Sequence, residues 1–262
     1  MPHIKMKVLD ILLCGCNGRM GRAVAQQVAA SDKMRIVAGI DIMATQNDSC
    51  PVFSSFSDFT GKADVIIDFS NPKGLASLLD YAVATGTPAV VCTTGLDEQQ
   101  KQSLRDASEK VAIFFSANMS IGINLICELA KKAAALLGTQ YDIEIIEKHH
   151  NQKLDAPSGT ALLIADEIST VFDEPREYVY DRHSVRRKRD TREIGIHAIR
   201  GGNIIGEHEV IFAGPNEVIE LSHSAASREV FALGAVRAAE FTAGKGAGMY
   251  NMSMLIAQTE AK

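Results

Sequence analysis

The sequence lacks the features that define several classes of protein. Apolar residues nowhere run on for about 18 positions, so we expect no transmembrane helix. The five cysteines are scattered and form no C-x-x-C pair, which argues against a metal site. Basic and acidic residues nearly balance, at 27 and 32, and the net charge of −5 argues against nucleic acid or an anionic membrane as a partner.

The start of the chain also lacks a convincing export signal. Residues 1–7 are basic and lead into an apolar run ending at Cys14, which superficially resembles such a signal. The run is short, contains Asp10 and continues directly into a glycine turn, so a buried first strand explains it better. Without export the thiols should stay reduced, and we expect a cytoplasmic protein.

The first half of the chain alternates apolar runs with segments of helical spacing, and its 262 residues allow one large domain or two modest ones. Strands separated by helices imply right-handed βαβ units and a parallel sheet of Rossmann type. The expected strands are 8–14, 35–40, 64–69, 88–92 and 111–115, and the expected helices are 22–30, 74–85 and 99–110.

In the second half of the chain, from about Ser120 onward, the spacing of expected strands and helices is different. Several strands follow one another with short connections, so we expect an α+β domain with an antiparallel or mixed sheet. The expected strands are 141–147, 193–199, 206–212 and 218–223, and the expected helices are 124–137, 161–172 and 230–241.

A glycine-rich loop follows the first expected strand and opens a helix. Gly15, Gly18 and Gly21 form the pattern G-x-x-G-x-x-G, which lets backbone N–H groups approach a pyrophosphate at a helix N-terminus. Asp41 ends the second strand, where a carboxylate can bind the adenosine ribose. Together these features predict a dinucleotide cofactor. Residues 68–72 and 92–95 follow the next two strands, at the edge of the sheet where the nicotinamide should lie.

The densest chemistry lies in residues 147–160, which read E-K-H-H-N-Q-K-L-D-A-P-S-G-T. Ser158 and the two residues after it would supply N–H groups at a helix start, an anion site to which Lys153 adds a charge. His149 and His150 can titrate near neutral pH. The segment therefore suits a small polyanionic substrate that needs proton transfer, although a histidine pair can also serve a purely structural role.

At this point the sequence resembles the dihydrodipicolinate reductase family, also called 4-hydroxy-tetrahydrodipicolinate reductases. Residues 147–160 are similar to the family signature E-x-H-H-x-x-K-x-D-A-P-S-G-T almost residue for residue. The similarity covers nearly the whole chain. It also includes residues 15–21, 68–72, 93–95, 116–120, 200–202, 206–208 and 234–237.

The resemblance implies that NADH or NADPH reduces a cyclic, unsaturated dicarboxylate to tetrahydrodipicolinate in diaminopimelate and lysine biosynthesis. It implies that His149 is the acid/base residue and Lys153 the proton donor. The residues implied to bind substrate are His150, Gly159, Thr160 and Thr94. The residues implied to bind the cofactor are Gly15, Cys16, Asn17, Gly18, Arg19, Met20, Asp41, Cys92, Thr93, Thr94, Ser116, Ala117, Asn118 and Met119.

The resemblance also implies a division of the chain and its assembly. Residues 1–120 would form the dinucleotide-binding domain, 121–229 a domain for substrate binding and tetramerisation, and 230–262 a segment that returns to the first domain. We expect the strands between 193 and 223 to lie in the interfaces of a homotetramer.

Three positions depart from the family pattern. Ile42 stands where many members have a basic residue that would pair with a 2′-phosphate, so we expect use of both cofactors with a preference for NADH. Cys92 replaces a common glycine and Met119 a common aromatic residue, and neither change removes a charge.

Two other interpretations remain open on the residues alone. One is a different Rossmann enzyme, such as an amino-acid or semialdehyde dehydrogenase, which would not need the segment 147–160. The other is a nucleotide sensor without catalysis, supported by a basic run that could face nucleic acid but that is usually a solvated loop. The run consists of Arg182, Arg186, Arg187, Lys188, Arg189 and Arg192.

Overall fold

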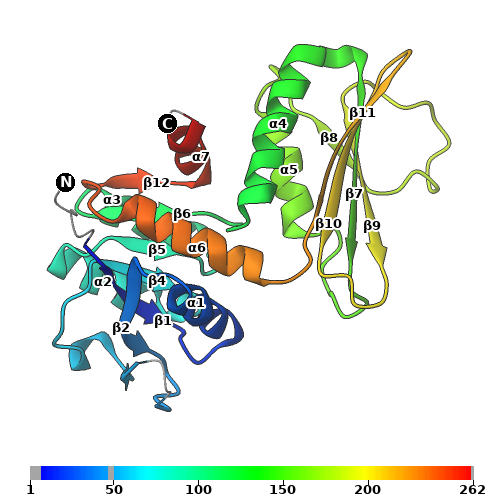
Figure 1. Ribbon diagram of the computed structural model, residues 1–262. Helices are drawn as coiled ribbons and strands as arrows, with labels where there is room; N and C mark the ends of the chain where they lie inside the picture. The colour runs from blue at the N-terminus through cyan, green and yellow to red at the C-terminus, as the bar shows by residue number, and fades with distance from the viewer. Residues whose placement is uncertain (1–6, 47–49, 261–262) are drawn as a thin grey trace, which may run out of the picture. The chain divides into compact units, whose positions relative to one another are not determined.

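The computed structural model describes residues 7–46 and 50–260. Residues 1–6, which supply most of the basic start compared above with an export signal, lie outside the described residues. The chain forms two compact units (Figure 1). The first unit contains the residues up to Ile121 and those from Arg228 onward, and the second unit contains Gly122–Ser227.

The first unit is built on an entirely parallel sheet in the order β12-β6-β5-β4-β1-β2-β3. All five strands expected from the sequence are confirmed, and two very short edge strands, β3 and β12, escaped prediction. The strands are β1 (Leu9–Cys14), β2 (Met34–Ile40), β3 (Val52–Phe53), β4 (Val65–Asp68), β5 (Ala89–Val91), β6 (Ala112–Phe115) and β12 (Gly248–Tyr250). The turns η1 (Phe56–Asp58) and η2 (Pro72–Gly74) are 3₁₀.

Helices cover both faces of this sheet, because its strands are apolar on both sides. Ile11 and Leu13 of β1 pack with α1, α6 and α7, whereas Leu12 and Cys14 pack with α2 and α3. These helices are α1 (Arg19–Ala29), α2 (Leu75–Thr85), α3 (Glu98–Ser108), α6 (Glu229–Thr242) and α7 (Met252–Glu260). Helix α1 begins three residues before its predicted start, because Gly18 of the glycine loop is itself the N-cap. Helix α7 was not predicted.

The second unit contains a mixed sheet in the order β11-β10-β7-β9-β8, as the spacing of its expected elements predicts. Strand β10 is antiparallel to both neighbours, and β7, β9 and β8 are parallel. The strands are β7 (Asp142–His149), β8 (Glu177–Val179), β9 (Glu193–Arg200), β10 (Glu207–Ala213) and β11 (Val218–Ser224). The helices are α4 (Ile121–Leu137), the 3₁₀ turn η3 (Gly138–Gln140) and α5 (Gly159–Ser169). Three-residue β8 is the one strand here that was not predicted among the described residues.

One face of this mixed sheet is apolar near the start of β7 and polar near its end. Ile143 and Ile145 of β7 point into an apolar core that includes Ile194, Val210 and residues of α4 and α5. Two and four residues after Ile145, on the same face, come Glu147 and His149, which are equally buried. Side chains alternate across a strand, so one strand supplies both the core and the start of a polar site.

Candidate active site

Two glycines of the G-x-x-G-x-x-G pattern, one in the loop after β1 and one in helix α1, occupy positions that no other residue would fit without distortion. Gly15 has a φ of +73°, and a Cβ there would lie 2.5 Å from the carbonyl oxygen of Phe69. A Cβ on Gly21 would lie 2.2 Å from the carbonyl oxygen of Gly15. The close approach of the loop after β4 and of helix α1 to this turn therefore explains the glycine pattern.

A cavity of about 1040 Å³ opens beside the glycine loop in the first unit. It is lined by the loops that follow β1, β2 and β4, at the carboxyl edge of the parallel sheet. Gly15, Cys16, Asn17, Gly18 and Asp41 are among its lining residues. The remaining residues assigned to the cofactor by resemblance are not in this lining, as far as the described residues show: Arg19, Met20, Cys92, Thr93, Thr94, Ser116, Ala117, Asn118 and Met119.

The Asp41 carboxylate is held in the cavity wall by backbone donors. Its Oδ2 accepts from the Asn17 N–H at 3.0 Å and its Oδ1 from the Met43 N–H at 2.9 Å. The Asn17 side chain donates in turn to the carbonyl oxygens of Met43 and Thr45, at 2.7 and 3.0 Å. These bonds join the glycine loop to the loop after β2. Ile42, next to the carboxylate, is 82 % exposed.

The loops after β4 and β5 are joined by a buried carboxylate. Asp68 accepts from the hydroxyls of Ser70 at 2.5 Å and Thr93 at 2.6 Å, and from the Ser70 N–H at 3.1 Å. Burial nevertheless raises the pKa of Asp68 above its ordinary value. The Thr93 hydroxyl therefore braces this loop, while Thr94 beside it is exposed.

Residues 116–119 form a turn braced by their own polar groups. The Ser116 hydroxyl donates to the carbonyl oxygen of Asn118 at 2.8 Å, and the Asn118 side chain accepts from the Ser120 N–H at 2.8 Å. Met119 is buried, and a Cβ on Gly234 would lie 1.7 Å from its carbonyl oxygen. Helix α6 can thus pack against this turn only because it has a glycine at the contact.

In the second unit, the end of β7 carries a fully buried carboxylate, Glu147. It accepts from both terminal nitrogens of Arg200, each at 2.7 Å, from the Ser158 N–H at 2.9 Å and from His149 Nδ1 at 2.6 Å. Burial alone would raise the pKa of Glu147, but the bonds from Arg200, His149 and Ser158 hold it below its ordinary value.

These contacts leave the other ring nitrogen of His149, Nε2, to face the loop before β10. A Cβ on Gly206 would lie 3.1 Å from that nitrogen. The His208 ring lies edge-on to the His149 ring, with centroids 5.2 Å apart, and its Nε2 is 3.0 Å from the Ser158 hydroxyl oxygen. Burial lowers the pKa of His208 to about 3, so this neighbour is neutral at physiological pH.

The loop from His150 to Ser158 brings a cation to the start of α5. Lys153 Nζ lies 2.9 Å from Asp155 Oδ1. Ser158 is the N-cap of α5 and accepts from the Ala161 N–H at 3.1 Å, so Gly159 and Thr160 are the first helical residues. The Asp155 carboxylate accepts from the Gly159 N–H as well, so an ammonium group and the N–H of a first helical turn converge on one anion, as in an anion-binding arrangement. His150 lies half-buried beside this loop.

The sequence assigned no individual role to Glu147, Arg200 or His208, although all three fall in family-like segments. For Ser158 it predicted only an N–H donor at a helix start. Arg200 is 53 residues from Glu147 in the chain. The parallel pairing of β7 with β9 places it opposite His149, and the pairing of β7 with β10 places His208 opposite Glu147. Only knowledge of strand register could have brought these residues together.

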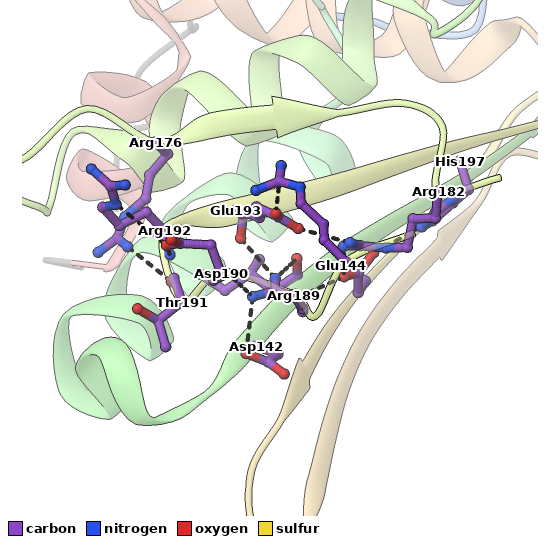
Figure 2. Close-up of polar contacts among 12 residues, drawn as sticks. Asp142, Glu144, Arg176, Arg182, Arg189, Asp190, Thr191, Arg192, Glu193 and His197 are labelled. Carbon is purple, nitrogen blue, oxygen red and sulfur yellow. Dashed lines mark hydrogen bonds and ion pairs between the residues drawn. The ribbon is translucent and has the colours of Figure 1, made fainter. Parts of the chain in front are cut away.

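The basic run between 182 and 192 is a largely exposed loop, as expected, in which Arg182, Arg187, Arg189 and Arg192 also form ion pairs (Figure 2). Arg182 and Arg189 contact Glu144 at 2.7 and 3.0 Å, and Arg182 and Arg187 contact Glu193 at 2.7 and 2.9 Å. A Cβ on Gly195 would lie only 1.7 Å from Glu144, so this glycine makes room for the network. Arg182, Arg187 and Arg189 thus pair with carboxylates of the second unit itself, which argues against the nucleic-acid interpretation.

Neither metal-binding nor membrane-spanning features appear in the described part of the chain. No group of three or more His, Cys, Asp or Glu side chains there is arranged to hold a metal ion. Likewise, none of the helices in residues 7–46 and 50–260 is long and apolar enough to cross a bilayer.

The class of the protein follows from these observations. A parallel sheet with a glycine turn after β1 and a carboxylate after β2 in the wall of the adjoining cavity is typical of a Rossmann-type dinucleotide-binding unit. With a cluster of charged and titratable side chains on a second unit, this architecture is that of a nicotinamide-dependent oxidoreductase, the class that the comparisons below establish.

Comparison with known proteins identifies the family. The model for the N-terminus of dihydrodipicolinate reductase matches residues 9–119, and that for its C-terminus matches residues 122–256. The 4-hydroxy-tetrahydrodipicolinate reductase of Clostridium novyi is 50 % identical over 246 residues, covering 94 % of this chain and 97 % of the relative. That of Caldanaerobacter subterraneus subsp. tengcongensis is 49 % identical over 249 residues, covering 95 % and 98 %.

A solved structure agrees with this assignment. The dipicolinate-bound dihydrodipicolinate reductase from Paenisporosarcina sp. TG-14 has a TM-score of 0.79 and 26 % identity, covering 93 % of this chain and 97 % of that one. The chain belongs to the dihydrodipicolinate reductase family. The predicted family, fold class and enzyme class are therefore confirmed, and so is the link to lysine and diaminopimelate biosynthesis.

Proposed function

We propose that the chain reduces 4-hydroxy-tetrahydrodipicolinate to tetrahydrodipicolinate with NADH or NADPH. A hydride from the nicotinamide and a proton are added to the ring, and one water is lost. The observation that supports this most is the cluster at the end of β7. It joins an oriented imidazole to an ammonium group and a helix start, as reduction of a dianion requires.

The substrate carboxylate is recognised at the start of α5 in this proposal. The N–H groups of Gly159 and Thr160 and the ammonium of Lys153 suit an anion, and His150 adds a further donor. Thr94, exposed on the first unit, is assigned to the substrate by family resemblance. The Paenisporosarcina reductase has dipicolinate bound, which supports a small dicarboxylate as the ligand of this chain too.

His149 acts as the acid/base residue and Lys153 as the proton donor. Because Glu147 lies against Nδ1, the nitrogen of His149 that exchanges the proton is Nε2. Lys153 pairs with Asp155, whose carboxylate is more exposed than that of Glu147. A substrate carboxylate can therefore replace Asp155 as the partner of the Lys153 ammonium.

The cofactor lies along the cavity of the first unit, with its pyrophosphate at the glycine loop and its ribose at Asp41. Residues 92–94 and 116–119 contact the nicotinamide half. Both cofactors are used, with a preference for NADH, because the Asp41 carboxylate repels a 2′-phosphate and Ile42 offers no compensating charge. Arg19, exposed at the start of α1, allows NADPH to bind as well.

The enzyme works as a cytoplasmic homotetramer, assembled through the sheet of the second unit and with the domain roles implied by the resemblance. The face of that sheet opposite its helices carries Ile146, Ile199 and Ile211 between charged residues, and Ile199 is 47 % exposed. Light scattering at micromolar concentration tests this, and a monomer would contradict it.

A direct assay tests the activity. The cyclic substrate is supplied together with NADH or NADPH, and oxidation of the nicotinamide is followed by its absorbance. We expect oxidation that depends on the substrate with both cofactors and is inhibited by dipicolinate. Absence of turnover with a protein that binds NADH would contradict the proposed reaction.

A further inference from the structure

Glu147 and Arg200 form an ion pair in the protein interior, where removing a charge from water costs free energy. Glu147 is fully buried, and the Arg200 side chain is 20 % exposed. Replacing a buried ion pair by apolar residues is often neutral or even stabilising, so such a pair is weak evidence of a stabilising role. A pair at this depth, two residues before His149, calls for another explanation.

The contacts of Glu147 leave its carboxylate one orientation. Arg200 binds both oxygens in the two-pronged geometry that fixes the carboxylate plane. The Ser158 N–H, at the start of α5, binds Oε1. Arg200 is itself anchored, because it also donates to the carbonyl oxygens of Ile199 at 2.8 Å and Asp155 at 2.7 Å. Oε2 is thereby aimed at His149 Nδ1.

We propose that Glu147, clamped by Arg200, is the positioning residue for His149, which it holds as the Nδ1–H tautomer with Nε2 presented for proton transfer. This inference rests on the proposed role of His149 as acid/base. An ionised carboxylate only accepts hydrogen bonds, so a 2.6 Å contact to Nδ1 requires the proton on that nitrogen. The same carboxylate stabilises the imidazolium that forms when Nε2 takes a proton.

The other groups around the ring fit this arrangement. From β10, His208 is neutral and does not oppose a charge on His149, and His223 of β11 lies beyond it. From the following loop, Lys153 is neutralised by Asp155. Glu147 is thus the anion in direct contact with the imidazole, and Arg200 is the cation that balances that anion.

The decisive experiment removes both charges together. In the double variant Glu147→Gln and Arg200→Gln, two amides replace the pair, so no lone buried charge remains to unfold the protein. We expect kcat to fall about 10- to 100-fold, the range for lost orienting groups, with KM and the Kd for NADH changing less than about threefold. The acidic limb of the kcat profile should also shift toward lower pH.

A matched control is Glu144→Gln, which removes another ion-paired carboxylate of β7 from the opposite face, away from His149. We expect it to leave kcat within about twofold. A folded double variant with native kcat, or an equal loss in the control, would overturn the positioning role.

Combining Glu147→Gln with His149→Gln separates this inference from the proposed function. If Glu147 acts through His149, it should cause no further loss of kcat once His149 is gone. A full additional loss overturns the inference alone. Native turnover in His149→Gln by itself overturns the proposed acid/base role instead.

A measurement on the unaltered enzyme does not depend on variants that fold. In protein labelled with ¹⁵N-histidine, with the His149 signals assigned by their absence in His149→Gln, we expect the neutral ring to be the Nδ1–H tautomer. Finding the Nε2–H tautomer would overturn the inference.

Discussion

The two units differ in which groups form their candidate sites, backbone in the first unit and charged side chains in the second. In the first unit the cavity proposed for the cofactor is shaped by backbone, through two glycines that admit close approach and N–H groups that hold Asp41. In the second unit the site consists of charged side chains, of which Glu147 and Arg200 are the most constrained. The difference matches the proposed ligands, because a row of N–H groups suits a pyrophosphate whereas proton transfer needs groups that titrate.

The comparison implies that the two sites fail in different ways. A change in the first unit should act through steric fit and show in cofactor binding. A change in the second unit should act through charge and show in turnover.

The largest expected effect comes from the titrating groups of the second unit. His149→Gln and Lys153→Ala should each lower kcat by about 10²-fold or more, because a lost acid–base group typically costs that much. The Kd for NADH, measured by fluorescence titration, should stay unchanged. Near-native turnover in either variant would contradict the role proposed for the replaced residue. Weakened NADH binding would contradict the expectation that changes in the second unit leave cofactor binding intact.

The next effect is steric and belongs to the first unit. Gly15→Ala adds a Cβ at a left-handed φ and against Phe69, which should lower the free energy of unfolding by about 2–3 kcal/mol and weaken cofactor binding. Gly86→Ala is the matched control, because Gly86 has a φ of +65° but a Cβ there meets nothing within 4 Å. Denaturant titration should show the smaller loss, about 1 kcal/mol, in the control. Equal losses would mean that contact with Phe69 is unimportant.

A third change introduces charge into the site built from backbone. Ile42→Arg should improve kcat/KM for NADPH relative to NADH by about tenfold or more, since a well-placed charged hydrogen bond is worth roughly 1.5–3 kcal/mol. Ile42→Gln controls for loss of the apolar side chain. A native enzyme that already prefers NADPH tenfold would show that Asp41 does not determine the preference.

The smallest effect is a difference in how the units respond to acid. The pKa of Glu147 is lowered from 4.5, so its stabilisation is present above that pH and lost as the pH falls through the lowered value. The pKa of Asp68 is raised from 3.8, so its contribution is present below that pH and lost as the pH rises through the raised value.

Melting temperatures between pH 7 and pH 3.5 measure this contrast. The difference between wild type and Glu147→Gln should be constant down to about pH 4.5 and shrink below it, whereas that between wild type and Asp68→Asn should widen as the pH falls. Changes of about 2–4 °C correspond to 1 kcal/mol in a chain of this size. Parallel curves for the two variants would contradict the opposite shifts.

Much of the fold could be predicted because its signals are local. Apolar runs such as residues 8–14 identify buried strands, and the glycine pattern after them requires a turn and a helix start. The strands and helix that escaped prediction, such as β3 and α7, are short or lie at edges, where few residues carry the periodic pattern. The ion pairs of the basic run at 182–192 escaped prediction for a related reason, since their acidic partners on β7 and β9 are distant in sequence.

By itself, the sequence determined the order of the longer elements, the glycine turn, the helix start at Ser158 and the family, because each depends on residues close together in the chain. Only the tertiary structure decided which nitrogen of His149 is presented and what holds it. That depends on Arg200 reaching Glu147 across 53 residues, through the parallel register of β7 and β9. Strand register is set by the packing of a whole sheet face, so no local pattern could have specified this contact.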